Sequence, residues 1–375
     1  MKNILITGGA GFIGSRLCEK LYNKGYVITV MDNLSKQIHG EEESLLFNKI
    51  KDKCIFIKGD VRNKADWRKA VKGQEVIIHL AAETGTGQSM YEIKKYTDVN
   101  IMGTVHMLEL LANTSHKVEK IIIASSRAIY GEGKYICSIH GDIYPSCRNK
   151  SDLEKANFNL KCSVCNSELQ LTATDESSKI HPSSIYGINK QQQEQMVMLM
   201  GKSLGIASVA FRYQNVYGPG QSLSNPYTGI LSIFSTRILN GNNLDIYEDG
   251  LESRDFVYID DVIDATILGL EKEKANGHVF NVGSGVATTV KEVADSLKRL
   301  YDSDINISIS GKFRSGDIRH NYADLDKIND LLGFIPKYSF QEGISKFVEW
   351  VKTQEIKEDK YEKSIKQLIS KGLLK

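Results

Sequence analysis

Short apolar runs alternate with longer amphipathic segments from Lys2 to Ala124. The runs are rich in Ile, Val and Leu, which is typical of strands buried on both faces, and they span residues 2–6, 26–31, 54–57, 75–80 and 120–124. Apolar residues at helical spacing follow the first run and recur over residues 91–113. This alternation predicts an α/β fold, with a doubly wound parallel Rossmann sheet that binds its ligand at the carboxyl ends of the strands.

A glycine-rich turn, Gly8-Gly9-Ala10-Gly11-Phe12-Ile13-Gly14, directly follows the first predicted strand. Glycines there let backbone N–H groups approach a pyrophosphate at the amino end of the next helix. Asp32 ends the second strand, where its carboxylate can bond ribose hydroxyls and would repel the 2′-phosphate of NADP. A tight turn without a ligand is the alternative, but strand, helix and acid together predict NAD binding. The contacts expected from these strand ends are Gly8, Gly11, Phe12, Ile13, Gly14, Asp32, Asn33, Ser35, Asp60, Val61, Leu80, Ala81 and Ala82.

A Tyr-x-x-x-Lys pattern, Tyr186 to Lys190, begins a later predicted helix. Residues four apart share one helix face, with Cβ atoms about 5–6 Å apart. An ammonium there would favour the phenolate and lower the pKa of Tyr186, which could then act as a base near neutral pH. Because the same pattern is common as an ordinary surface pair, its meaning depends on Ser125 and Ser126, which follow the buried run at residues 120–124.

Together these motifs resemble the extended short-chain dehydrogenase/reductase superfamily, specifically its nucleotide-sugar epimerases and dehydratases. The resemblance runs from Lys2 to about Trp350 apart from one insertion, and it includes residues 7–14, 79–82, 100–104, 125–126, 212–219 and 254–262. It implies that Tyr186 is the acid/base, that Lys190 holds the nicotinamide ribose and tunes Tyr186, and that Ser126 bonds the reacting sugar oxygen. Asn100 would support the region of Lys190, so the resemblance adds Asn100, Tyr186 and Lys190 to the NAD site.

The resemblance also implies a nucleotide-sugar site. Asn215 and Arg254 would bind the nucleotide diphosphate, because an arginine fork suits phosphate oxygens. In the segment Arg314-Ser315-Gly316-Asp317, Arg314 would reach the pyrophosphate and Asp317 the nucleoside ribose. Thr84, in the glycine-rich loop after Ala82, would line the sugar pocket near the nicotinamide. The chain departs from the family at Gln214, where Phe is common.

The two positions after Ser126 discriminate between reactions. The resembling 4,6-dehydratases have Asp and Glu there, and the sugar-acid decarboxylases have Glu at the second, whereas this chain has Arg127 and Ala128. Without those carboxylates elimination lacks an obvious catalyst, which leaves hydride transfer alone. Residues 81–92 and 125–133 and the cysteine-bearing insertion resemble those of dTDP-L-rhamnose 4-epimerases. We therefore expect tightly bound NAD and C4 epimerisation of a nucleotide-linked 6-deoxyhexose, with dTDP-L-rhamnose giving dTDP-6-deoxy-L-talose through a 4-keto intermediate.

Three alternatives remain open at this point. The first is a 4-keto-sugar reductase, which would use the same side chains but more often NADPH. The second is an epimerase of UDP-, GDP- or CDP-linked sugars. The third is a non-catalytic NAD sensor or scaffold, which the intact Ser126, Tyr186 and Lys190 disfavour.

An insertion, residues 134–178, lengthens the interval between Ser126 and Tyr186 to 60 residues. It contains two pairs, Cys137 with His140 and Cys162 with Cys165, at the spacing of knuckles that close a tetrahedral zinc site. Four protein ligands predict a structural Zn²⁺, which would supply folding energy to a segment with few large apolar residues. Incidental thiols or a redox Cys-x-x-Cys pair are the alternatives, and Cys147 falls outside the paired spacing.

The composition excludes other classes of protein. Lys and Arg number 48 against 46 Asp and Glu, a formal charge of +2, which gives no basis for binding nucleic acid or a membrane surface. No run approaches the ~18 apolar residues of a membrane span, and the short apolar start is unlike a signal peptide. We therefore expect a cytoplasmic protein.

Four parts are expected along the chain. Residues 1–220 and 254–282 would form the NAD-binding Rossmann domain, with the insertion 134–178 inside it. Residues 221–253 and 283–350 would form a smaller lobe for the nucleotide sugar, and 351–375 a helical tail packed on its own subunit. In the resembling proteins, the helices that correspond to 91–113 and 186–204 form a four-helix interface, so we expect a homodimer.

Overall fold

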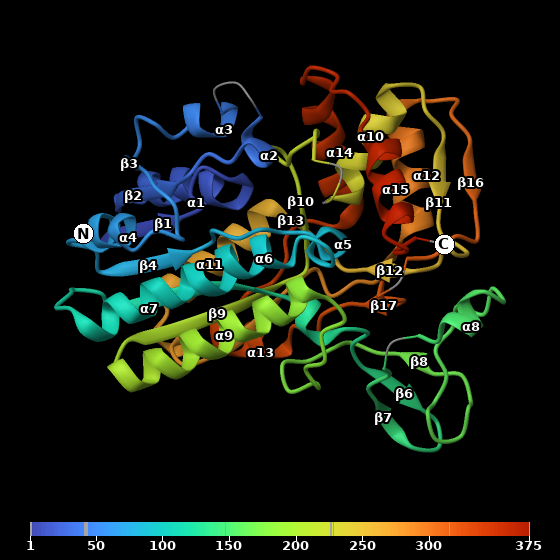
Figure 1. Ribbon diagram of the computed structural model, residues 1–375, viewed down its shortest axis with the longest axis horizontal. Helices are drawn as coiled ribbons and strands as arrows, with labels where there is room; N and C mark the ends of the chain where they lie inside the picture. The colour runs from blue at the N-terminus through green and yellow to red at the C-terminus, as the bar shows by residue number, and fades with distance from the viewer. Residues whose placement is uncertain are drawn as a thin grey trace.

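The computed structural model describes residues 2–40, 44–146, 148–225, 227, 229–314 and 316–374. A 7-stranded parallel sheet forms its centre, in the order β14-β9-β5-β4-β1-β2-β3 (Figure 1). The strands are β1 (Asn3–Thr7), β2 (Val27–Asp32), β3 (Ile55–Lys58), β4 (Val76–His79), β5 (Lys120–Ser126), β9 (Ala207–Tyr213) and β14 (Val279–Val282). Each apolar run expected to be a strand is one, and the predicted doubly wound Rossmann sheet is confirmed.

Helices cover both faces of this sheet, and alternate strand residues face one layer or the other (Figure 1). Ile4 and Ile6 join a core with α1 (Phe12–Asn23) and α11 (Ile259–Glu271). Leu5 joins a second core with α4 (Lys64–Val71), α7 (Gly103–Asn113) and α9 (Ile185–Leu204). The sheet is thus buried on both sides, and its strand ends are left to form a site.

The helix expected over residues 91–113 is not a single α-helix. It consists of α6 (Ile93–Tyr96), a π-helical turn (Thr97–Met102) and α7. The buried Asn100 lies in that wide turn, where it accepts a bond from the N–H of Glu83 at 2.9 Å and donates one to the Glu83 carbonyl at 3.1 Å. The turn therefore holds the loop that follows β4, as such turns often do beside functional sites.

Capping side chains fix where α9 begins. The Ser184 hydroxyl accepts from the Gly187 N–H at 3.1 Å, and Gly205 ends the helix with a φ of +69°. Strand β5 pairs with β9 so that Ser126 lies opposite Tyr213. These two features bring the end of β5 and the first turn of α9 to the same edge of the sheet.

A second group of elements lies beyond the carboxyl ends of the strands (Figure 1). It contains α10 (Ile230–Leu239), β11 (Leu244–Ile246), α12 (Val290–Tyr301), β16 (Ile307–Ile309) and α14 (Phe340–Lys352), with capping boxes at the starts of α12 and α14. The tail forms α15 (Tyr361–Ser370), in which Tyr361 and Leu368 are buried on this chain. Among the described residues, no helix combines the length and apolar character that a membrane span requires.

The insertion protrudes from the body as a small antiparallel sheet, in the order β7-β6-β8 (Figure 1). Its elements are β6 (Tyr135–Cys137), β7 (Gly141–Ile143), α8 (Lys150–Leu153) and β8 (Gln170–Leu171). The remaining short elements are α2 (Lys36–His39), α3 (Leu45–Asn48), α5 (Thr86–Ser89), β10 (Asn215–Tyr217), β12 (Ser253–Arg254), β13 (Phe256–Tyr258), β15 (Thr288–Thr289), β17 (His320–Asn321) and α13 (Asp326–Leu332), with 3₁₀ turns at Arg127–Tyr130 and Glu273–Ala275.

Candidate active site

The glycine turn after β1 has the shape of a dinucleotide cradle. Gly8 has a φ of +68°, and a Cβ at this position would lie 2.7 Å from the Ala81 nitrogen. A Cβ at Gly14 would lie 2.3 Å from the Gly8 carbonyl oxygen, so both positions require glycine. Asp32 is held at the end of β2 by the N–H groups of Ala10 at 3.1 Å and Leu34 at 2.9 Å. These residues fit the pyrophosphate and adenosine ribose of NAD.

A cavity of about 1380 Å³ runs from this turn to the end of β5. It brings together most of the residues that the sequence nominates for the cofactor and the sugar. The nominated residues that line it are Gly8, Gly11, Phe12, Ile13, Gly14, Asp32, Asn33, Ser35, Val61, Leu80, Ala81, Ala82, Thr84, Ser126, Tyr186, Lys190 and Asn215. One continuous space therefore connects the cofactor turn with the side chains expected to do the chemistry.

Ser126, Tyr186 and Lys190 meet in this cavity. The Ser126 hydroxyl is hydrogen-bonded to the Tyr186 phenol and also accepts from the Ala128 N–H at 3.1 Å. Lys190 is buried, and its ammonium donates to the Ala124 carbonyl at 2.9 Å and lies 5.9 Å from the centre of the Tyr186 ring. The Tyr186 N–H is held in turn by the Ser89 hydroxyl at 3.1 Å, a contact the sequence did not indicate.

The electrostatics of this group differ from the sequence expectation. Burial raises the pKa of Tyr186, while the hydrogen bond to Ser126 and the charge of Arg127 lower it. Burial lowers the pKa of Lys190 to about 7, so a smaller fraction of this side chain is protonated near neutral pH. Ser126 and Arg127 therefore favour the phenolate of Tyr186, and the tuning of Tyr186 by Lys190 stays a prediction.

Two nominated NAD contacts lie outside the cavity lining. The Asp60 carboxylate accepts hydrogen bonds from Asn33 and Arg62. Burial raises the pKa of Asp60, but the hydrogen bonds from Arg62 and Asn33 have the larger effect and hold this pKa at about 2. Gly59 and Val61 line the cavity on either side of it. Asn100 holds Glu83, as described above, and supports the cavity through that loop and not through Lys190.

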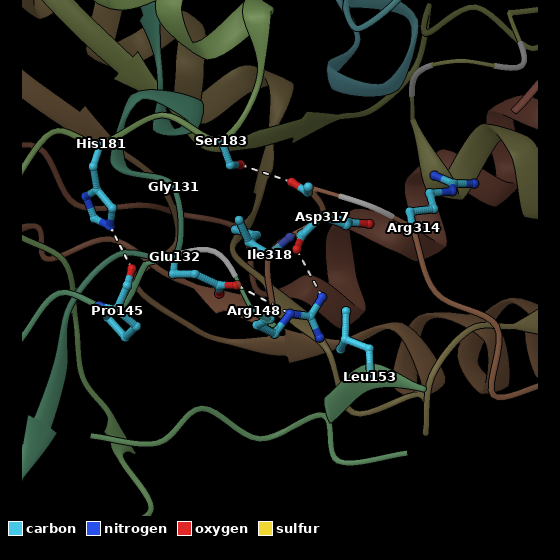
Figure 2. Close-up of a pocket in the computed structure, with 11 residues that line it drawn as sticks. Gly131, Glu132, Pro145, Arg148, Leu153, His181, Ser183, Arg314, Asp317 and Ile318 are labelled. Carbon is cyan, nitrogen blue, oxygen red and sulfur yellow. Dashed lines mark hydrogen bonds and ion pairs between the residues drawn. The ribbon is translucent and has the colours of Figure 1, made fainter. Parts of the chain in front are cut away.

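Arg314 and Asp317 line a second, smaller cavity of about 30 Å³ (Figure 2). The insertion supplies part of its wall, because Arg148 donates to the Asp317 carbonyl at 3.0 Å and lies 3.4 Å from the Glu132 carboxylate. Burial raises the pKa of Glu132 to about 7 against the opposing charge of Arg148. The sequence did not single out Glu132 or Arg148, because neither lies in a motif with known spacing. Ser315, in the same nominated segment, lies outside the described residues.

Arg254 lines neither cavity. Its two terminal nitrogens donate to the carbonyls of Ser253 at 2.8 Å, Arg319 at 3.1 Å and Ile318 at 2.8 Å, and to the Asp317 carboxylate at 2.8 Å. Burial would raise the pKa of Asp317, but the arginines around it, Arg254 first, hold it below the usual range. In this structure Arg254 orders the segment that carries Asp317.

Gln214 and the tail add features that periodicity did not show. Gln214 lines the large cavity, and both atoms of its side-chain amide are buried without a hydrogen-bond partner among the described residues. Lys357, Lys360 and Lys363 of the tail also line this cavity. The tail thus contributes positive charge to the rim of the site.

The four nominated metal ligands of the insertion converge. The ligand atoms of Cys137, His140, Cys162 and Cys165 all lie within 4.8 Å of one another. The Cys137 sulfur is 3.6 Å from that of Cys165 and 3.5 Å from the His140 Nδ1. Bonds of about 2.3 Å to sulfur and 2.0–2.1 Å to nitrogen in a tetrahedron place ligand atoms roughly 3.5–3.8 Å apart. The four residues therefore fit a zinc ion; Cys147 lies outside the described residues.

Comparison with known proteins settles the family. Residues 4–150 and 163–283 match the model of the NAD dependent epimerase/dehydratase family. The chain belongs to this family. The interruption at residues 151–162 falls within the insertion, so the family pattern continues on both sides of it.

Individual members of the epimerase/dehydratase family match over nearly the whole chain. A dTDP-L-rhamnose 4-epimerase of Burkholderia thailandensis is 36% identical over 352 residues, which is 93% of this chain and 95% of that protein. The structure of a UDP-glucose 4-epimerase of Thermotoga maritima with UDP-glucose has a TM-score of 0.74 at 30% identity, covering 93% and 98% of the two chains. A UDP-glucuronic acid 4-epimerase of Bacillus cereus, with UDP-glucuronic acid and NAD, has a TM-score of 0.75 at 27% identity, covering 93% and 99%.

Proposed function

We propose that the protein is an NAD-dependent nucleotide-sugar 4-epimerase acting on a nucleotide-linked 6-deoxyhexose, with dTDP-L-rhamnose converted to dTDP-6-deoxy-L-talose. The observation that carries the reaction is the meeting of Ser126, Tyr186 and Lys190 in the cavity that begins at the glycine turn. Arg127 and Ala128 stand where elimination would need carboxylates. The match to the Burkholderia enzyme supports the choice of sugar and nucleotide.

NAD, when bound, would accept a hydride from the sugar C4 and return it to the opposite face. Tyr186 would hold the proton of the C4 hydroxyl while the ketone exists and give it back when the alcohol re-forms. Ser126, bonded to the Tyr186 phenol, would orient the same oxygen. Lys190 lies on the helix face beside Tyr186, where it would hold the cofactor ribose. Because the cycle is redox-neutral, tight retention of NAD suits it.

The test of this proposal is turnover without added cofactor. Purified protein incubated with dTDP-L-rhamnose should form the C4 epimer, observed by NMR, and reach the same mixture from either sugar. A 4-keto sugar reduced at the expense of NADPH, with no epimer formed, would instead identify a reductase. A panel of UDP-, GDP- and CDP-sugars would reveal a different nucleotide, which the similarity to UDP-sugar epimerases makes the second candidate.

For the insertion we propose a structural Zn²⁺ bound by Cys137, His140, Cys162 and Cys165. The support is that the four ligand atoms all lie within 4.8 Å of one another, with separations of 3.5 and 3.6 Å that match a tetrahedral zinc site. Metal analysis after metal-free purification should give close to one zinc per chain. A value near zero from folded protein would refute the site.

We also propose a homodimer through the helices α6, α7 and α9. Exposed apolar side chains on and between these helices support it, namely Ile93, Met102, Ile188 and Leu199. Light scattering should give twice the chain mass, and Leu199→Asp should shift the measured mass toward that of the monomer.

We also propose that the chain is divided into an NAD-binding domain, a nucleotide-sugar lobe, an insertion and a tail. A cytoplasmic location is part of the same proposal, because reduced thiols would be available there to the metal.

A further inference from the structure

Arg127 lines the large cavity and has no role in the chemistry described so far. It directly follows Ser126 and begins the 3₁₀ turn Arg127–Tyr130, which places it on the cavity wall beside Tyr186. Its Nε donates to the Asn215 side-chain oxygen at 3.2 Å. In the part of the chain that the structure describes, no carboxylate lies within ion-pair distance of Arg127, and its two terminal nitrogens have no hydrogen-bond partner.

The surroundings of the Arg127 guanidinium favour the binding of an anion. Burial, and next the like charge of Arg254, lower the pKa of Arg127 to about 10. Asp317 opposes this effect, but its carboxylate is already bonded to Arg254 at 2.8 Å. A guanidinium withdrawn from water is stabilised when a hydrogen-bonding anion completes its surroundings. A phosphate group, which accepts two parallel N–H bonds from an arginine fork, has the matching chemistry.

Arg127 is better placed for this role than Arg254. Both terminal nitrogens of Arg254 are committed to Asp317 and to backbone carbonyls. Those of Arg127 are free within the described residues, and its neighbour Asn215 lines the same cavity. Arg127 also adjoins Ser126, at the end of the cavity where the sugar would react. Of the two phosphates in a nucleotide sugar, the one bonded to the sugar C1 would therefore lie nearest to it.

We propose that Arg127 binds the sugar-side phosphate of the substrate diphosphate and so fixes the sugar against Ser126 and Tyr186. This inference rests on the proposed function, because it requires a nucleoside diphosphate in the cavity. Arg127 would thus bind phosphate from the turn that directly follows Ser126, while Arg254 holds Asp317.

The experiment compares a nucleoside diphosphate with its monophosphate. Calorimetric titrations of the NAD-loaded protein with dTDP and with dTMP, at one ionic strength, separate the sugar-side phosphate from the rest of the nucleotide. The variants are Arg127→Gln, Arg127→Lys and, as a matched control, Arg16→Gln, which removes an exposed arginine paired with Asp260 at 2.9 Å. The NAD content and the circular dichroism spectrum of each variant verify that it is folded. If only uridine nucleotides bind, UDP and UMP replace dTDP and dTMP in the titrations.

Arg127→Gln should weaken dTDP binding about 10- to 100-fold, the usual worth of charge-assisted hydrogen bonds, and dTMP binding less than about threefold. Arg127→Lys should recover part of the dTDP affinity, because it keeps the charge, and Arg16→Gln should match the wild type. Equal losses for dTDP and dTMP, or no loss for dTDP, in a folded NAD-loaded variant would overturn the role of Arg127. Failure of the wild type to bind any nucleoside diphosphate would refute the proposed function itself.

Discussion

A buried ion pair joins α9, the helix that carries Tyr186 and Lys190, to the sheet, and its removal is a sensitive test of the structure. Glu194 lies one turn along α9 from Lys190 and accepts from Arg212 of β9 at 2.6 and 3.0 Å. It also accepts from the Ser125 hydroxyl of β5 at 2.5 Å. The two charged side chains are 5% and 4% exposed. Glu194 thus joins α9 to the two strands that end beside the active site.

Glu194→Gln keeps the shape of this side chain and removes its charge. Arg212 would remain buried with only neutral partners, chiefly the Tyr130 phenol at 2.6 Å and the Glu176 carbonyl at 3.0 Å. Removing one member of a buried pair costs about 3–5 kcal/mol. Because glutamine can still accept one bond from Arg212, we expect the low end, about 3 kcal/mol of the free energy of unfolding.

The assay is urea unfolding of the variant, with the shift of midpoint multiplied by the slope. The matched control is Glu271→Gln, which breaks a surface pair with Lys24 at 2.7 Å, in which the side chains are 34% and 42% exposed. Such pairs contribute about 0–1 kcal/mol. If Glu194→Gln lost less than about 1 kcal/mol, or no more than Glu271→Gln, the argument that this pair holds α9 in place would be refuted.

Four further outcomes are expected. Tyr186→Phe should abolish turnover while the protein keeps its NAD, and unchanged turnover would exclude Tyr186 as the base. Turnover should rise with pH as Tyr186 deprotonates. In Arg127→Gln the midpoint of this rise should move to higher pH, because the charge that lowers the pKa of Tyr186 is gone. A midpoint that stays the same or moves to lower pH would contradict this prediction. Cys162→Ser should lose zinc and make the insertion sensitive to limited proteolysis while the NAD content is unchanged, whereas retained zinc would remove Cys162 from the ligand set. Truncation after Gln354 should raise the KM for the nucleotide sugar, since Lys357, Lys360 and Lys363 line the cavity, and an unchanged KM would show that the tail does not touch the substrate.

The sheet and the cofactor turn could be predicted from the sequence because both depend on local patterns. An apolar run such as that of β5 predicts a buried strand whatever elements pack against it. Glycine is required at positions 8 and 14 because other backbone atoms lie where a Cβ would be. The π-helical turn could not be predicted in this way. It depends on Asn100 meeting Glu83, a contact between different elements that leaves helical periodicity unchanged.

The contacts on the substrate side of the site could not be read from the sequence, for a related reason. Motif position suggested that Arg254 binds phosphate, but what an arginine can bind depends on which of its donors are already used. The same holds for Arg148, whose place beside Asp317 follows from how the insertion folds back on the body. Tyr186 and Lys190 were identified correctly as neighbours, yet the balance of their pKa values depends on burial, which spacing does not report.

The position of the insertion has a consequence for chain entropy. Ser126 and Tyr186 are anchored at one edge of the sheet, so the 60-residue interval between them is a closed loop. Closure of a flexible loop costs only about 0.6 kcal/mol more for each doubling of its length. A zinc ion bound as proposed by Cys137 and Cys165 would divide this loop into shorter ones. The protein can thus carry a long excursion between Ser126 and Tyr186, the two side chains proposed to act on the sugar, at a small cost in chain entropy.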